Sequence, residues 1–266
     1  GHPIVVEAGQ KQMAQLNTNT RYLYDILPEY AENLLSKLPN HLNKVYFVNS
    51  GSEANDLAIR MARIHTKFDQ IMVIEHGYHG HTQTGIDISD YKFNHPKGQG
   101  KKDHILKTKI PNAYNGIHTG EHAGSQYASD AVDEIKNSEK AIAAFICEPI
   151  IGCGGQVPLA QGYLKRVYDA IQAQGGICIS DEVQTGFGRL GNCFWGFEQH
   201  QVMPDMVVIG KPMGNGHPMG AVITTDAISH SFEQGVEFFS SFGGNPVSCA
   251  IGNAVLKVIE TEQLQE

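Results

Sequence analysis

Short apolar runs rich in Val, Ile and Phe alternate along the chain with segments in which apolar residues recur at helical spacing. This alternation is typical of a mainly parallel sheet flanked by helices, so the sequence predicts an α/β fold. The expected strands are Val45–Val48, Gln70–Ile74, Ala143–Cys147, Ile177–Ser180, Met206–Ile209 and Ala221–Thr224. Residues 92–126 are rich in Gly, Lys, Asn and His without periodicity, and we expect a long surface excursion there.

The length, net charge and apolar runs of the sequence limit the number of domains and the kinds of partner that we expect. The 266 residues, 41% of them apolar, suffice for one large domain. The net charge of -8 and the scarcity of Lys and Arg clusters argue against nucleic acid and membrane surfaces as partners. No apolar run approaches the roughly 18 residues that span a bilayer, and no signal-peptide pattern opens the chain. We therefore expect a cytoplasmic protein whose five cysteines are small buried hydrophobic residues.

The two ends of the sequence look cut. There is no initiator Met, and the last helix-like run, Cys249–Glu266, stops without a Gly or Pro terminator. We expect residues 1–266 to be a single large domain taken from a longer protein.

The first chemically informative stretch joins an expected strand to an expected helix at Asn49–Asn55. Ser50 and Glu53 match the S-x-x-E capping box, which places a helix N-terminus beside Gly51 and Ser52. Free backbone N–H groups and the helix dipole attract anions there, and glycine allows close approach of a ligand. The sequence is therefore compatible with a phosphate site at Gly51 and Ser52, although an ordinary capped helix remains the alternative.

Two further strand ends carry polar side chains. Asp181 follows the strand at Ile177–Ser180, where it can hold a metal, pair with a cation or cap the following loop. Lys211 follows Met206–Ile209, and a lysine with a desolvated amine is suited to Schiff-base chemistry; a surface lysine is the alternative. A phosphate site, an acid and a lysine together describe a pocket for pyridoxal 5'-phosphate (PLP).

Three histidines, His76, His79 and His81, lie within six positions around Tyr78. Their spacing is compatible with zinc, but no acidic residue follows within five positions and the glycines between them indicate a bending loop. We therefore expect no metal site in this segment.

The segments NSGSEANDLAIR, YHGH, SDEVQTGFGRLG, GKPMGNGHP and FGGNPVSCA occur in this order between about residues 45 and 250. In this the chain resembles the class-III aminotransferases. The resemblance implies the large domain of the type I PLP-dependent transferase fold, a mainly parallel sheet flanked by helices. It also implies a small C-terminal domain and an extreme N-terminus that this sequence does not include.

The resemblance assigns roles to individual residues. It implies that Lys211 is the Schiff-base lysine, Asp181 the partner of the ring nitrogen, and Gln184 a donor to the ring hydroxyl. Gly51 and Ser52 resemble the phosphate cup.

Four further assignments follow from the same motifs. Tyr78 resembles the aromatic residue that stacks on the pyridine ring, and His79 then lines the substrate pocket. Glu148 resembles a glutamate that pairs with a substrate-gating arginine in the missing part. Ser241 stands where the family usually has a threonine, which implies a homodimer in which Ser241 reaches the neighbouring subunit's cofactor.

Within the family, YHGHTQTGIDISDYKF and GKPMGNGHP are most similar to phospho-lyases that act on O-phosphoethanolamine and phosphohydroxylysine. We therefore expect a small primary amine as substrate and an elimination of phosphate from it. The alternative is an omega-aminotransferase of the alanine–glyoxylate type, which transfers the amino group to a keto acid. Two other classes stay open: a metal-dependent hydrolase built on the histidines, and a PLP-fold remnant without catalysis.

Overall fold

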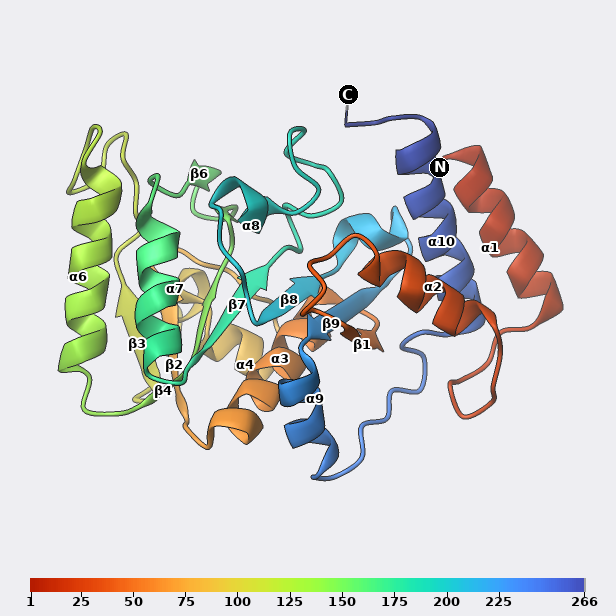
Figure 1. Ribbon diagram of the computed structural model, residues 1–266, viewed down its shortest axis with the longest axis horizontal. Coiled ribbons are helices and arrows are strands. Elements are labelled where there is room, and N and C mark those ends of the chain that lie inside the picture. Colours follow the sequence, from red (N-terminus) through yellow and green to blue (C-terminus); the bar gives the residue numbers. More distant parts are fainter. Residues whose placement is uncertain (266) are drawn as a thin grey trace.

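A computed structural model describes residues 1–265 of the chain, and one seven-stranded sheet forms its centre (Figure 1). The strand order is β1-β9-β8-β7-β4-β2-β3. The strands of this sheet are β1 (Lys44–Val48), β2 (Gln70–Ile74), β3 (Ile105–Thr108), β4 (Ile142–Cys147), β7 (Ile177–Asp181), β8 (Met206–Ile209) and β9 (Gly220–Thr224). A separate antiparallel pair is formed by β5 (Ile150–Ile151) and β6 (Val157–Pro158).

The five consecutive strands from β8 to the edge strand β3 run parallel, whereas β9 is antiparallel to both of its neighbours, β8 and β1. Strands β2, β4, β7, β8 and β9 are buried along their whole length, as expected where helices cover both faces. This confirms the α/β fold with a mainly parallel sheet, and all six expected strands are present.

Eleven helical segments accompany the sheet in the described part of the chain. They are α1 (Pro3–Gln15), α2 (Ile26–Leu35), α3 (Gly51–Thr66), α4 (Gln83–Asp87), α5 (Asp90–Phe93), α6 (Ala123–Asn137), α7 (Tyr163–Ala173), α8 (Gly196–Gln199), the 3-10 helix η1 (Lys211–Gly214), α9 (Asp226–Glu233) and α10 (Pro246–Thr261).

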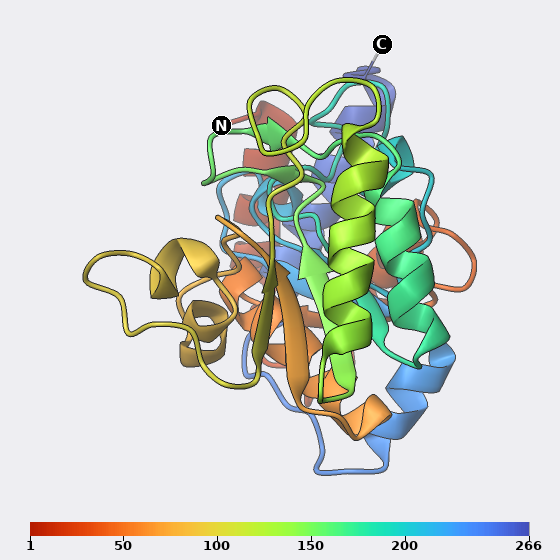
Figure 2. The ribbon, with the colours of Figure 1, turned by 90° about the vertical axis from the view of Figure 1, so that its left-hand side faces the viewer.

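Two hydrophobic cores lie on the two faces of the sheet. One face is covered by α6 and α7, which lie side by side in Figure 2, and its core continues through α2 and α10. The other face is covered by α3 and α9. Apolar residues at helical spacing explain this packing, because Ala54, Leu57, Ala58 and Met61 turn one face of α3 onto the strands.

The expectation of a long surface excursion over residues 92–126 is wrong in part. Strand β3 lies inside it and forms the edge of the sheet beside β2, and α6 already begins at Ala123. Only the two end positions of β3, Ile105 and Thr108, are buried, so four residues leave too short a pattern to detect.

Two smaller expectations also need correction. The last helix, α10, begins at Pro246 behind the N-cap Asn245 and ends at Thr261, rather than running from Cys249 to the chain end. Of the cysteines, Cys147, Cys178 and Cys249 are buried, but Cys153 is exposed and Cys193 is half-buried. Among residues 1–265, no helix combines the length and apolar character needed to cross a membrane.

Candidate active site

A pocket of about 650 Å³ opens at the carboxyl ends of the parallel strands. Its walls come from the loops after β1, β2, β4, β7 and β8, which is where α/β sheets of this kind bind ligands. Eight of the nine predicted site residues line it: Gly51, Ser52, Tyr78, His79, Glu148, Asp181, Gln184 and Lys211. Ser241 alone of the predicted set lies elsewhere.

The N-terminus of α3 forms one wall of the pocket. The Ser50 side chain caps it by accepting from the Glu53 backbone N–H, while the Glu53 carboxylate accepts from Asn49 rather than from Ser50. A Cβ atom at Gly51 would lie 2.8 Å from a methyl carbon of Val183, so only glycine fits between this helix end and the loop after β7. The capped end therefore presents backbone N–H groups to the pocket, as an anion site requires.

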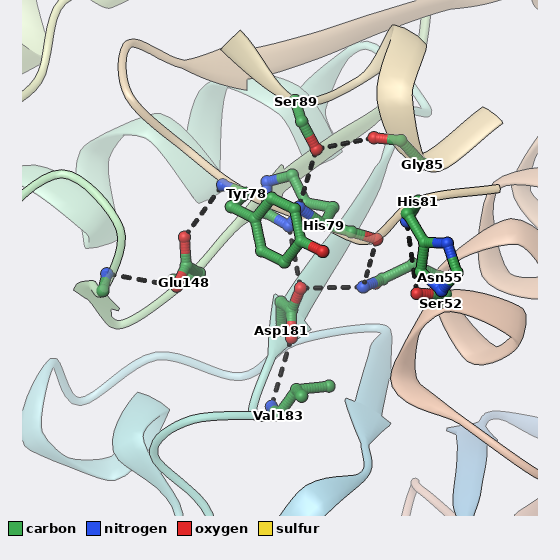
Figure 3. Close-up of polar contacts among 11 residues, drawn as sticks. Ser52, Asn55, Tyr78, His79, His81, Gly85, Ser89, Glu148, Asp181 and Val183 are labelled. Carbon is green, nitrogen blue, oxygen red and sulfur yellow. Dashed lines mark hydrogen bonds and ion pairs between the residues drawn. The ribbon is translucent and has the colours of Figure 1, made fainter. Parts of the chain in front are cut away.

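The segment that follows β2 is fixed against the same helix end. Gly80 adopts a φ of +117°, and a Cβ atom there would lie 2.6 Å from Ser52 Oγ. The backbone N–H of His81 donates to Ser52 Oγ at 3.2 Å (Figure 3). Ser52 is thus held by the loop that carries Tyr78 and His79.

Asp181 ends β7 and is 2% exposed. Its Oδ2 accepts from His79 Nδ1 and from Asn55 Nδ2, each at 2.8 Å, and its Oδ1 accepts from the Val183 backbone N–H at 3.1 Å. These three donors compensate for the hydration that burial removes from the carboxylate. Because Asp181 accepts from the Val183 backbone N–H, it caps the loop that follows β7. Asp181 therefore both caps this loop and lines the pocket.

His79 lies behind Asp181 rather than in the open part of the pocket. Its ring is buried, with Nδ1 on Asp181 and Nε2 without a partner among the described residues. Since Nδ1 faces a carboxylate oxygen, it is the nitrogen that carries the proton. His79 lines the pocket as expected, and its ring also supports Asp181 through Nδ1.

Lys211 begins η1 directly after β8 and Gly210 and lines the pocket. The residue is exposed, so it stands at the surface of the strand end and borders the pocket at the same time. Gln184 is half-buried and lies on the same loop as Asp181.

Glu148 connects the Tyr78 loop to the loop after β5. Its two carboxylate oxygens accept from the backbone N–H groups of Tyr78, at 3.0 Å, and of Gly152, at 3.1 Å. Burial raises the pKa of Glu148 to about 7, against the opposing effect of His79. Burial also raises the pKa of the Tyr78 hydroxyl, which is therefore neutral at physiological pH. Within residues 1–265 the partners of Glu148 are backbone groups, and no arginine contacts it.

Ser241 is exposed and lies outside this chain's own pocket. Four large apolar residues of the segments around positions 22–24 and 236–244 are each more than half exposed: Tyr22, Leu23, Val236 and Phe242. The two segments that carry them are joined, because the Tyr24 hydroxyl donates to the Gly244 carbonyl at 2.7 Å.

The pocket also contains residues that the sequence did not single out: Asn55, Arg189 and His217. Asn55 follows Gly51 by four positions, so the helical period would have placed it on the same face of α3. His217 lies in the glycine-rich segment after Lys211, and its Nε2 lies 2.9 Å from Ser248 Oγ. No spacing in the sequence marks Arg189, which is exposed at the pocket mouth.

The three histidines around Tyr78 do not converge. His76 and His81 are exposed, whereas His79 is buried on Asp181. In the part of the chain that the structure describes, no group of three His, Cys, Asp or Glu side chains is arranged to hold a metal ion.

Comparison with known proteins gives a family. The family model described as "Aminotransferase class-III" matches residues 1–266. An "Alanine--glyoxylate aminotransferase 2-like" protein of Drosophila melanogaster is 49% identical to all of this chain, which covers 56% of that protein. "Ethanolamine-phosphate phospho-lyase homolog 1" of Caenorhabditis elegans is 41% identical over the whole chain, which covers 60% of it. The chain thus spans little more than half the length of these relatives.

A solved structure described as a phospholyase from Arthrobacter in complex with phosphoethanolamine has the same fold, with a TM-score of 0.91 and 38% sequence identity. The match covers all of this chain and 63% of that one. The family uses pyridoxal 5'-phosphate, and the residues of this pocket fit that cofactor. An anion-binding helix end, a buried carboxylate with an acceptor site left over and an amine line one cavity, as its phosphate, ring nitrogen and aldehyde require.

Proposed function

The chain belongs to the class-III aminotransferase family, and from this premise we propose that the whole protein transfers an amino group from a small primary amine to a keto acid such as glyoxylate. The observation that carries a PLP-dependent function is the presence of Lys211, Asp181 and the N-terminus of α3 around one pocket. The 49% identity to the Drosophila aminotransferase-like protein favours amino transfer as the reaction.

Six of the residues that line the pocket have a task in this chemistry. When bound, PLP supplies an electron sink for the pair that remains when the substrate's α-carbon loses a proton. Lys211 provides the amine that takes this proton, and Asp181 holds the proton on the ring nitrogen. The backbone N–H groups at Gly51 and Ser52 hold the phosphate, Gln184 donates to the ring hydroxyl, and the Tyr78 ring covers the pyridine face and excludes water.

The second candidate is a phospho-lyase, which the Arthrobacter structure with phosphoethanolamine favours. Here the same proton leaves the α-carbon, and the bond between the next carbon and the phosphate oxygen breaks. With water added, phosphoethanolamine then gives acetaldehyde, ammonia and inorganic phosphate. Lys211 and Asp181 have the same tasks in both reactions, so the choice depends on what occupies the carbon next to the amine.

The two reactions differ in what they consume. Purified full-length protein, loaded with PLP, is incubated with alanine and glyoxylate in one experiment and with phosphoethanolamine alone in another. Amino transfer predicts pyruvate and glycine in the first and no phosphate in the second. Phosphate release without a keto acid would reject amino transfer in favour of the phospho-lyase.

The lysine assignment has an independent test. Borohydride reduction of the loaded protein is expected to attach the cofactor to the peptide that contains Lys211. A label on another lysine, or no label in a protein saturated with PLP, would contradict the assignment of Lys211. The variant Lys211→Ala should lose the label and both reactions.

A homodimer is part of this proposal. Ser241 is exposed and does not line its own pocket, and four large apolar side chains of residues 22–23 and 236–242 are exposed as well: Tyr22, Leu23, Val236 and Phe242. Burial of this apolar surface against a second copy would stabilise the dimer. Sedimentation of the full-length protein should give a dimer that Leu23→Asp weakens, and a monomer in the unsubstituted protein would reject this part of the proposal.

A further inference from the structure

Asn55 lies in α3 one helical turn after the phosphate-binding end at Gly51 and Ser52. Its side chain is 2% exposed and reaches two acceptors, Asp181 Oδ2 at 2.8 Å and the His79 carbonyl oxygen at 3.0 Å. Figure 3 shows it between these two groups, with the Asp181 carboxylate at the centre of the cluster.

The chemistry of these partners determines the orientation of the amide. A carboxylate oxygen and a carbonyl oxygen are both acceptors, so the amide nitrogen of Asn55, with its two hydrogens, must face them. The Oδ1 atom of Asn55 is then buried without a partner among the described residues. A buried acceptor without a donor costs free energy. The two hydrogen bonds that Nδ2 donates therefore offset the cost of burying Oδ1 of the same amide.

The Asp181 carboxylate has room for one more donor. A carboxylate offers about four acceptor sites, two on each oxygen. Oδ2 is saturated by Asn55 and His79, whereas Oδ1 has only the Val183 backbone N–H. The unused site is therefore on Oδ1, and the two donors on Oδ2 fix the rotation of the carboxylate that determines where this site points.

From this geometry we infer that Asn55 is a positioning residue that sets the ring-nitrogen partner, Asp181, at a fixed distance from the phosphate site. Both ends of the cofactor are then held by one rigid helix, the phosphate at its first turn and the acid through a side chain one turn, about 5.4 Å, further along. This inference rests on the proposed PLP-dependent function. It predicts that Asn55 acts on the cofactor only through the ring nitrogen.

The test compares two cofactors in the full-length protein: PLP and 1-deaza-PLP, in which a carbon replaces the ring nitrogen. Dissociation constants are measured by titration of the apoprotein and need no turnover. Loss of a hydrogen bond to a charged group predicts that Asn55→Ala weakens PLP binding about 10-fold. Binding of 1-deaza-PLP should change by less than about 2-fold, because that cofactor has no ring nitrogen for Asp181 to meet.

Thr185→Val is the matched control. It removes one buried donor from the Glu182 carboxylate, which adjoins Asp181 in sequence but does not line the pocket. It should leave both dissociation constants within about 2-fold of the unsubstituted protein, since the interaction it removes does not reach the cofactor. Asn55→Leu keeps a side chain of similar size without its donors and adds no charge beside Asp181, and it should repeat the selective loss of PLP binding.

The outcomes separate this inference from the function on which it depends. If the unsubstituted protein binds neither cofactor, the proposed function is rejected. Where it binds PLP, equal losses for both cofactors, or no loss, would overturn the role of Asn55. If neither Asn55 variant keeps the native circular dichroism spectrum, the residue is needed for folding and the positioning role is likewise overturned.

Discussion

Asp181 and Glu182 are neighbours in the sequence and both are buried, yet they belong to different parts of the molecule. Asp181 receives two of its three hydrogen bonds from side chains of α3 and the Tyr78 loop, and it lines the pocket. Glu182 does not line the pocket, and all of its hydrogen-bond partners lie within residues 180–197. Two adjacent acids thus provide a comparison between a carboxylate held for a ligand and one held for the fold.

The number of acceptor sites in use explains the difference. Glu182 accepts from the Ser180 and Thr185 hydroxyls and from the backbone N–H groups of Gly196 and Phe197. All four sites of its carboxylate are therefore occupied, and it ties residues 180–185 to the start of α8. Asp181 keeps one site open. A buried carboxylate with an unused acceptor site beside a cavity is thus the better candidate for a ligand contact.

The largest expected effect is on catalysis by Asp181. Replacement by Ala removes the charge that holds the ring-nitrogen proton and should lower kcat/KM on the order of 10³-fold. Steady-state kinetics of the PLP-saturated full-length protein measure it. Glu182→Gln is the control, because it changes a carboxylate of the same burial away from the pocket. If Asp181→Ala and Glu182→Gln lowered kcat/KM equally, the proposed difference between the two acids would be contradicted.

The second effect is on stability and concerns Glu182. Glu182→Ala leaves two hydroxyls and two backbone N–H groups without their acceptor, which should lower the free energy of unfolding by about 3 kcal/mol. Urea unfolding of the full-length apoprotein measures this change. Turnover per folded molecule should stay within about 2-fold, since no contact with the cofactor is lost. A variant as stable as the unsubstituted protein would contradict the structural role of Glu182.

The smallest effect concerns Glu148, a buried acid that supports the pocket through backbone groups. Burial raises its pKa from 4.5 to about 7, so the folded protein keeps a proton that the unfolded chain releases in this interval. The contribution of Glu148 to the free energy of unfolding is complete below pH 4.5 and is lost as the pH rises to about 7. The free energy of unfolding falls by at most about 3 kcal/mol over this interval. Glu148→Gln should flatten the decline in that interval, as urea unfolding at several pH values measures. Identical pH profiles would place the titration elsewhere.

Much of the fold could be predicted because buried parallel strands are short, continuous apolar runs. β2 and β8 were predicted to the residue. Strand β3 was missed because an edge strand needs only two buried side chains, and Lys107 beside Leu106 interrupts its pattern. The antiparallel placement of β9 depends on pairing with β1, a long-range contact that no local pattern records.

Most of the pocket could be predicted because the carboxyl ends of parallel strands meet at one edge of the sheet. Asp181 and Lys211 were found by this rule alone. The support of Asp181 was not, because Asn55 and His79 reach it from α3 and the loop after β2, and only the assembled sheet brings these segments together. Ser241 was assigned by resemblance, and it lies outside the pocket in a stretch, residues 235–242, that is exposed or half-buried throughout.

The pairing of β1 with β9 also has a consequence for biosynthesis. β1 leads into the phosphate-binding end of α3, but its partner β9 follows Lys211, and β2, β3, β4, β7 and β8 are all synthesised between the two. Until Lys211 and β9 are made, β1 has an open edge, and the pocket lacks the wall that carries the lysine. The complete pocket therefore forms only after Lys211 and β9 have been synthesised, and a nascent chain that stalls before β9 exposes β1 as an unpaired strand.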